Sequence, residues 1–306
     1  MRLRLHWIVL LTAVFIPGAV RADEPAPRLL LVDGQALLDA RRRASSDERI
    51  QRAVDELRRE ADEALNAGPF SVTNKDVEPP SGDKHDYMSV GPYWWPNPDT
   101  DDGLPYVRRD GEVNPQRDDY DSRPMSQMTS AVESLTLAWA MTRHEPYAQH
   151  AAKLLRAWFL DDATRMNPHL RFGQAIPGRT QGRGIGIIDT HRLLFIVDAA
   201  VILRSSNAWT DADHTALKQW FGQYARWLRE SGHGRSAAGA RNNIGTWYDV
   251  QAVTFALFAG QVEPAREILQ RAKAKRIASQ IEPDGRMPHE LARTRSFDYT
   301  SFNLLA

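Results

Sequence analysis

Two polar segments in the C-terminal third of the chain carry side chains that could act together on an acidic substrate. The first spans residues 241–251 and contains Asn243, and the second spans 286–299 and contains Arg293 and Tyr299. Asparagine and arginine can neutralise a carboxylate by donating hydrogen bonds, and a tyrosine hydroxyl can transfer a proton. A tyrosine near arginines can also have its phenolate form favoured. This combination indicates proton transfer on a substrate that carries a carboxylate.

Two irregular stretches upstream are the expected source of further site residues. Residues 75–124 are rich in Pro, Gly, Asp and aromatic side chains, and residues 167–189 are rich in Gly and Arg. Both are too long to be passive connections, and long loops on a rigid scaffold are where sites are usually built. From these stretches and the two polar segments we predict seven substrate contacts: His85, Tyr87, Trp94, Trp95, Arg179, Asn242 and Arg295.

Several of these residues have a second interpretation. The tryptophans of the string Tyr93-Trp94-Trp95 can stack on sugar rings, but a Trp beside a Pro also commonly pins a loop to the core. Arg179 and Arg183 could hold carboxylates along a cleft or could belong to a solvated loop. Three further charged residues could orient the site or form buried ion pairs without a part in the chemistry: Arg241, Glu290 and Asp298.

The elements that must position these residues are helical. Apolar residues recur at steps of three and four in the segments 45–65, 125–142, 146–160, 191–203, 211–230, 247–258 and 264–281. Short links between consecutive segments place neighbouring helices antiparallel. The segments 29–32 and 70–72 are the exceptions, where short strands are expected.

The helix pattern predicts an all-α fold, an (α/α) toroid or incomplete barrel built from antiparallel helical hairpins with long irregular site-forming loops. An ordinary irregular helical bundle is the alternative. Residues 302–306 resemble the start of a buried helix, and we therefore expect the toroid to be truncated at the C-terminus.

Composition excludes several classes of function. The 306 residues include 39 basic and 39 acidic side chains and no cysteine. A net charge of zero argues against a general nucleic-acid surface, and the lack of cysteine excludes disulfides and thiolate nucleophiles. The acidic residues Asp99, Asp101 and Asp102 lack the spacing of a calcium loop, and the nine histidines show no close ligand spacing. No metal and no cofactor are predicted.

The N-terminus predicts export. Residues 1–22 combine a basic start, a short apolar run and the cleavage triplet Val20-Arg21-Ala22, which is typical of a secretory signal. The alternative is an uncleaved anchor, but the apolar run is short for a bilayer span. We expect one domain over residues 23–306, periplasmic or secreted and not bound to a membrane after cleavage. The oligomeric state is not predicted.

Four groups of residues, taken in order, resemble the alginate-lyase-like polysaccharide lyases. They are 85–87 with 93–96, the loop 172–178, the segment 242–251 and the segment 293–299. The resemblance runs from about residue 75 to the C-terminus. Within this group the sequence is most similar to the branch that acts on β-1,4-linked glucuronan and mannuronan-type chains.

The resemblance implies β-elimination on a polyuronate such as alginate, polymannuronate or glucuronan. The proton on C5, next to the carboxylate, is removed and the O4 glycosidic bond is then expelled, without a metal ion. The carboxylate must be neutralised so that the developing negative charge is stabilised. By position, Asn243 matches the neutralising asparagine, Arg293 its cationic partner, and Tyr299 the tyrosine that serves as base and acid.

One position departs from the family pattern. The residue after the second asparagine is usually a histidine in this family, but here it is Ile244. Three hypotheses follow: catalysis depends on the three remaining groups, another histidine fills the gap, or the protein binds glycans without cleaving them. The candidates for the second hypothesis are His85, His191 and His289. A glycoside hydrolase is a weaker alternative, since it needs two carboxylic acids across a cleft and no convincing pair is evident.

Overall fold

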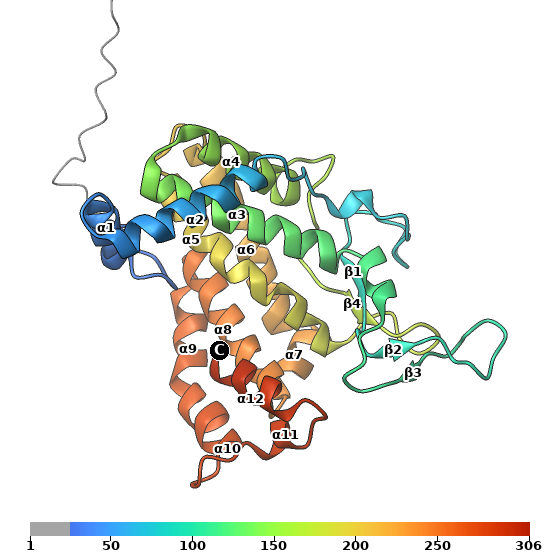
Figure 1. Ribbon diagram of the computed structural model, residues 1–306. Coiled ribbons are helices and arrows are strands. Elements are labelled where there is room, and N and C mark those ends of the chain that lie inside the picture. Colours follow the sequence, from blue (N-terminus) through green and yellow to red (C-terminus); the bar gives the residue numbers. More distant parts are fainter. Residues whose placement is uncertain (1–24) are drawn as a thin grey trace, which may run out of the picture.

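The computed structural model describes residues 25–306, and most of these residues lie in helices (Figure 1). The expected signal peptide, residues 1–22, lies outside the described residues. Between residues 25 and 306, no helix combines the length and the apolar character that a bilayer span would require.

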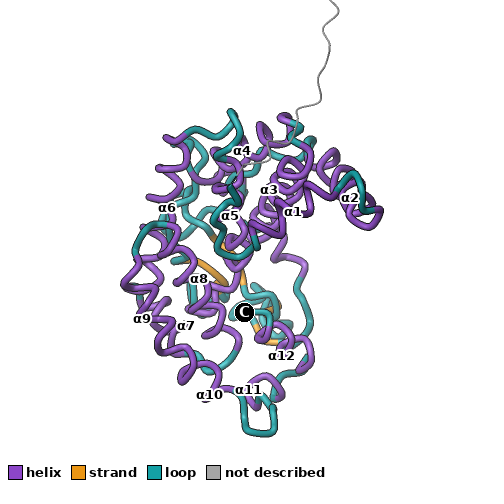
Figure 2. Tube along the Cα trace, turned by 90° about the vertical axis from the view of Figure 1, so that its left-hand side faces the viewer, coloured by secondary structure: helices purple, strands orange, loops and turns teal. Residues whose placement is uncertain are grey.

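The long helices follow one another as hairpins. The described helices of eight or more residues are α1 (Gly34–Arg43), α2 (Glu48–Ala64), α3 (Ser122–Thr142), α4 (Glu145–Phe159), α5 (Leu194–Leu203), α6 (Asp211–Glu230), α7 (Gly232–Gly239), α8 (Asn243–Phe258), α9 (Val262–Ala272) and α12 (Ser296–Leu304). Helix α3 packs against α2, α4 and α5, and α8 packs against α5, α6, α9 and α12. The chain is therefore an all-α toroid of antiparallel hairpins, as the helix pattern predicts (Figure 2).

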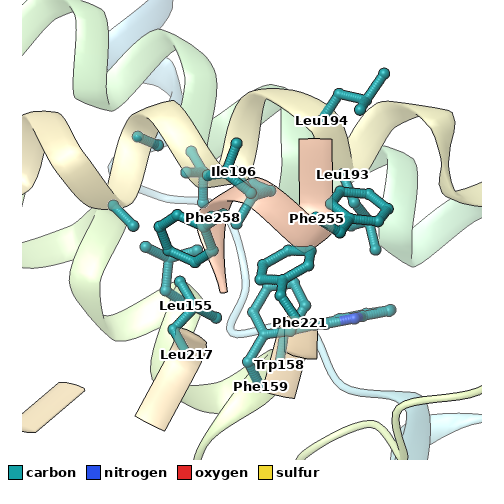
Figure 3. Close-up of a cluster of buried hydrophobic side chains, with 14 of the residues drawn as sticks. Leu155, Trp158, Phe159, Leu193, Leu194, Ile196, Leu217, Phe221, Phe255 and Phe258 are labelled. Atoms are coloured by element: carbon teal, nitrogen blue, oxygen red, sulfur yellow. The ribbon is translucent and has the colours of Figure 1, made fainter. Parts of the chain in front are cut away.

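The hairpins share one apolar core. Figure 3 shows side chains from α4, α5, α6 and α8 meeting in this core, among them Leu155, Phe159, Ile196, Leu217, Phe221, Phe255 and Phe258. The rings of Phe221 and Phe255 lie 4.8 Å apart, and both side chains are fully buried. Burying a side chain of this size stabilises a fold by about 1.5–3 kcal/mol. This core holds the helices that carry the site in fixed positions.

Short strands join the two irregular stretches. Strand β1 (Met88–Val90) pairs in parallel with β4 (Phe172–Ala175), and β2 (Trp94–Trp95) pairs antiparallel with β3 (Val107–Arg108). In Figure 1 these strands lie on one side of the helical body, and the loop between β2 and β3 reaches farthest from it. A 3-10 helix, Gly184–Leu193, then leads from the second irregular stretch into α5.

The two predicted strands, 29–32 and 70–72, are wrong. The backbone N–H groups of Leu30, Leu31 and Val32 donate to the carboxylate of Asp198 in α5, at 2.7–2.9 Å, so a side chain replaces the partner strand. Residues Val72–Asn74 form a 3-10 turn that is capped by the hydroxyl of Ser71.

The predicted helices are confirmed with shifted ends. The segment predicted at 264–281 is helical from Val262 to Gln280, but a π-helical turn, Lys273–Ile277, separates α9 from the short α10 (Ala278–Gln280). The last helix, α12, begins at Ser296 rather than near residue 302 and follows the short α11 (Pro288–Leu291). Helices α1 and α7 were not predicted.

Candidate active site

Asn243, Arg293 and Tyr299 line one cavity. Its volume is about 440 Å³, and its walls come from the N-terminus of α8, from α12 and the turn before it, from the 3-10 helix Gly184–Leu193 and from the loop around β2. This volume is in the range of small-molecule sites. The structure thus brings together the three side chains that the sequence picks out.

Arg293 and Tyr299 are in direct contact. An Nη2 hydrogen of Arg293 is donated to the Tyr299 hydroxyl at 2.8 Å, and the guanidinium carbon lies 3.9 Å from the centre of the tyrosine ring. Nη2 also lies 3.0 Å from a carboxylate oxygen of Asp110. Burial alone would raise the pKa of Asp110, but hydrogen bonds from Arg293, Thr294 and Arg108 hold it well below its usual range. Asp110 therefore stays ionised and fixes the arginine.

The Tyr299 hydroxyl is the donor in a second contact, to the hydroxyl of Tyr93 at 2.8 Å. Burial raises the pKa of Tyr299 above its ordinary value, and the hydrogen bond to Tyr93 raises it further. The positive charge of Arg293 acts in the opposite direction but does not prevail. The surroundings of Tyr299 therefore favour the neutral phenol, contrary to the expectation that arginines favour the phenolate.

Asn243 is oriented by Glu290. Asn243 is the first residue of α8, where backbone N–H groups have no partner within the helix. Its N–H donates to Glu290 Oε1 at 2.5 Å, and its side-chain nitrogen lies 3.0 and 2.9 Å from the two carboxylate oxygens. Asn303 donates to the same carboxylate at 3.0 Å. Because a carboxylate only accepts, it fixes which end of the Asn243 amide faces it.

The cavity is strongly cationic although the chain has no net charge. Asp189 is the one carboxylate residue among the side chains that line it. The arginines that line it are Arg108, Arg117, Arg183, Arg192 and Arg293. A cavity of this kind attracts anions. Elsewhere in residues 25–306, no group of three or more His, Asp or Glu side chains is arranged to hold a metal ion.

Comparison with known proteins shows which protein family the chain belongs to. The sequence model of the alginate lyase family matches residues 71–306. The chain belongs to the alginate lyase family. The crystal structure of an alginate lyase from Bacteroides ovatus is 42% identical in sequence and superposes with a TM-score of 0.89, over 91% of this chain and 73% of that one. None of the curated proteins matches the chain. The chain is thus a member of a polysaccharide-lyase family with the toroid fold.

Ile244 stands at the position where the family resemblance leads us to expect a histidine. Its side chain is 7% exposed, lines the cavity and belongs to the apolar core. It follows Asn243 in the first turn of α8. An aliphatic group therefore forms the wall where the resemblance expects an imidazole.

Of the three candidate histidines, one lines the cavity. His191 packs its ring against Trp247 and Phe302, at 5.2 and 5.4 Å between ring centres. Its Nδ1 lies 2.6 Å from the carbonyl oxygen of Ile188, which can only accept, so Nδ1 carries the hydrogen and Nε2 the lone pair. Burial lowers the pKa of His191 and favours the neutral ring.

The other two histidines lie away from the cavity. His85 Nδ1 contacts the carbonyl oxygen of Arg165 at 2.6 Å, and His289 is exposed. Neither is among the residues that line the cavity.

Of the three aromatic residues predicted to contact the substrate, only Trp94 lines the cavity. Trp95 lies outside it, and its ring nitrogen donates to the carbonyl of Glu112 at 3.1 Å, which holds the loop in place. Tyr87 is fully buried and its hydroxyl donates to Asp189 at 3.1 Å, so the predicted substrate contact is corrected to a structural role.

The remaining predicted contacts lie outside the cavity. Arg179 is exposed, and its Nε donates to the carbonyl of Tyr106 at 2.9 Å. Arg295 pairs at 2.6 Å with Asp298, and both side chains are more than half exposed. Asn242 precedes α8 and makes no capping hydrogen bond with its side chain. Three residues were expected to orient the site: Arg241, Glu290 and Asp298. Glu290 contacts Asn243, whereas Arg241 is exposed and Asp298 pairs with Arg295.

Sequence analysis missed Tyr93 and Asp110 as partners of the site. Tyr93 stands beside the predicted tryptophans, so its place in the string was the available signal. Asp110 lies 183 residues before Arg293 in a loop, and no local pattern links the two.

Proposed function

We propose that the protein cleaves a β-1,4-linked polyuronate, of the alginate, polymannuronate or glucuronan type, by β-elimination. The observation that carries the proposal is the direct contact of the Arg293 guanidinium with the Tyr299 hydroxyl in a cavity that Asn243 also lines. A positive charge, an amide and a phenol are the groups that the removal of a proton next to a carboxylate requires.

The proposed reaction begins with Tyr299 as phenolate. Its oxygen takes the proton from C5, the electron pair forms the C4=C5 double bond, and the C4–O4 bond breaks. The leaving glycosidic oxygen then takes the proton from the Tyr299 hydroxyl. Arg293, held by Asp110, stabilises the charge on the substrate carboxylate during the step. Since Arg293 supplies this positive charge, the proposed step uses no metal ion.

Asn243 is proposed as the second group on the carboxylate. Glu290 already engages its amide nitrogen. One amide hydrogen must therefore be shared with the substrate, or turned toward it, when the substrate binds. We also propose that the protein acts in the periplasm or outside the cell, which rests on the signal-like residues 1–22.

The substitution Tyr299→Phe tests the mechanism. It removes the proton-transferring hydroxyl and keeps the ring, so we expect the rate on polymannuronate and glucuronan to fall by roughly 10²–10⁴-fold. The absorbance of the unsaturated uronate product is the measurement.

The matched control is Tyr106→Phe, which removes a hydroxyl bonded to Gln116 outside the cavity. This variant should keep its activity. Full activity in Tyr299→Phe would remove Tyr299 from the mechanism.

A second candidate function is glycan binding without cleavage, and the observation that favours it is Ile244 in the cavity wall. A binding titration with each polymer beside the absorbance assay separates the two functions. Binding without any unsaturated product in the unaltered protein would support the second candidate.

A further inference from the structure

Arg183 is a charged side chain in the cavity wall that forms no direct ion pair within the described residues. It lines the cavity, and no carboxylate among residues 25–306 lies within ion-pair distance of its guanidinium. Burial lowers the pKa of Arg183, which shows that the charged form loses solvation there. Asp189 acts on Arg183 only from beyond ion-pair distance, so an acidic ligand would give this partly buried guanidinium a direct partner.

The side chain of Arg183 is held in place on several sides. Its Nε donates to the backbone carbonyl of Gln174 at 2.8 Å, and Nη2 donates to the Gln174 side-chain oxygen at 3.1 Å. The guanidinium lies over the ring of Trp94 at 5.9 Å. Gly91 makes room for this arrangement, because a Cβ there would come within 2.7 Å of Nη2 and 2.6 Å of the Trp94 ring.

The residue that holds Arg183 is itself fixed in an unusual conformation. Gln174 has a backbone φ of 49°, which lies in the left-handed region that residues other than glycine rarely adopt. Its N–H donates to Ser89 Oγ at 2.7 Å, and its side-chain nitrogen donates to Asp189 at 3.0 Å. These contacts keep the guanidinium in place before any ligand arrives, which lowers the entropy cost of binding.

Arg183 and Arg293 are held by different residues. Gln174 and Trp94 contact the guanidinium of Arg183, whereas Asp110 and Tyr299 contact that of Arg293. Arg293 is already paired with Asp110 at 3.0 Å. Only two of the five N–H donors of Arg183 have an acceptor within the described residues. The free donors can therefore serve a second acidic group.

We propose that Arg183 binds the carboxylate of a second sugar unit, distinct from the uronate that Asn243, Arg293 and Tyr299 act on. This proposal rests on the proposed function, because a uronate polymer presents a carboxylate on every ring. Arg183 then selects chains in which two acidic units follow one another through the cavity. It is a substrate-binding residue and takes no part in proton transfer.

A double-mutant cycle tests this assignment. Binding of a mannuronate or glucuronate tetrasaccharide is measured by calorimetry, with Tyr299→Phe in every protein so that no cleavage occurs. Arg183→Ala should weaken binding roughly ten- to hundredfold and should reduce the dependence of affinity on salt. Its effect should multiply with that of Arg293→Ala, because separate carboxylates give independent losses.

Two further variants separate binding from structure. Arg183→Lys keeps the charge, so it should keep the salt dependence while losing part of the affinity. Arg171→Ala removes an exposed arginine that lies over Phe172 outside the cavity, and it should bind normally. Unfolding midpoints show whether each variant is folded.

Four results would overturn the proposal. Normal affinity in folded Arg183→Ala refutes it directly. Losses from Arg183 and Arg293 that fail to multiply would assign both to one carboxylate. A loss in Arg183→Lys as large as in Arg183→Ala, with unchanged salt dependence in both, would show a structural role. If the tetrasaccharide does not bind even with Arg183 intact, the proposed function fails together with this inference.

Discussion

Tyr299 is held as a neutral phenol by its surroundings, so it must lose its proton before the proposed chemistry can begin. Its hydroxyl both accepts from Arg293 and donates to Tyr93. The hydrogen bond to Tyr93 stabilises the protonated form, while the bond from Arg293 stabilises the phenolate. The balance between these two neighbours therefore controls how easily the base forms.

Tyr93→Phe tests this balance through the pH dependence of kcat/KM. The base must lose its proton before it can act. Because burial raises the pKa of Tyr299 above the ordinary tyrosine value of about 10, kcat/KM of the unaltered protein should still be increasing at pH 10. Without the Tyr93 hydroxyl the neutral phenol loses its acceptor, and the rising limb should move to lower pH.

The control for this experiment is again Tyr106→Phe, whose pH profile should match that of the unaltered protein. A limb that stays in place or moves to higher pH in Tyr93→Phe would show that Tyr93 does not stabilise the neutral form.

The sequence predicted the three side chains that meet in the cavity better than it predicted their partners. Asn243, Arg293 and Tyr299 lie in two segments with distinctive spacing and were found without the structure. Asp110 reaches Arg293 because the turn that follows β3 lies beside the turn before α12, and no pattern within either segment records that contact. Tyr87 shows the opposite error, since an aromatic residue in a loop motif turned out to be core.

At the scale of elements, one ion pair links two hairpins. Arg156 of α4 donates to both carboxylate oxygens of Asp213 in α6, at 3.0 and 2.6 Å. Asp213 also accepts from Thr210, whose own hydroxyl caps the helix start. The same carboxylate therefore closes the first turn of α6 and ties it to α4.

This pair predicts a loss of stability in acid. Burial alone would raise the pKa of Asp213, but hydrogen bonds from Arg156 and Thr210 lower it from 3.8 to about 2. A carboxyl with a lowered folded pKa contributes stability that is present above pH about 4 and is lost as pH falls toward 2. We expect Asp213→Asn to reduce the free energy of unfolding by about 1–2 kcal/mol at pH 7, and by much less near pH 2.

Urea unfolding at several pH values is the measurement. Asp211→Asn is the matched control, because Asp211 lies in the same first turn but its side chain is 91% exposed. This control should change stability little at any pH. An equal loss at pH 7 and near pH 2 in Asp213→Asn would point to capping geometry rather than charge.

Helix type was predictable from the sequence, but element ends and strands were not. Periodicity located α6 with its full bounds, but the ends of most other helices shifted by one to four residues. It could not show that residues 184–193 form a 3-10 helix before α5. Nor could it show that Asp198 would accept the N–H groups of residues 30–32, since that contact spans more than 160 positions in the chain.

At the scale of the molecule, the charges are balanced in total but not in position. The chain has 39 basic and 39 acidic residues, yet arginines dominate the cavity. The proposed attraction of a polyuronate would therefore come from the cavity and not from a net charge.

Salt dependence tests this distribution. Raising the ionic strength from about 0.05 to 0.5 M shortens the range of electrostatic attraction. We expect KM for a polyuronate to rise several-fold over this range while kcat changes little. Initial rates by absorbance measure both constants, and a KM that is indifferent to salt would contradict an electrostatic role for the cavity.

The contact between residues 30–32 and Asp198 limits how the protein can be shortened. The family match starts at residue 71, which suggests Leu30 and its neighbours are dispensable. However, Asp198 is fully buried in α5, and the three N–H groups of that segment are what satisfies its carboxylate. Trimming at the expected cleavage point spares this anchor. A protein that starts at the family boundary would instead lose all three of these donors to the Asp198 carboxylate, and with them a tie between the N-terminal segment and α5.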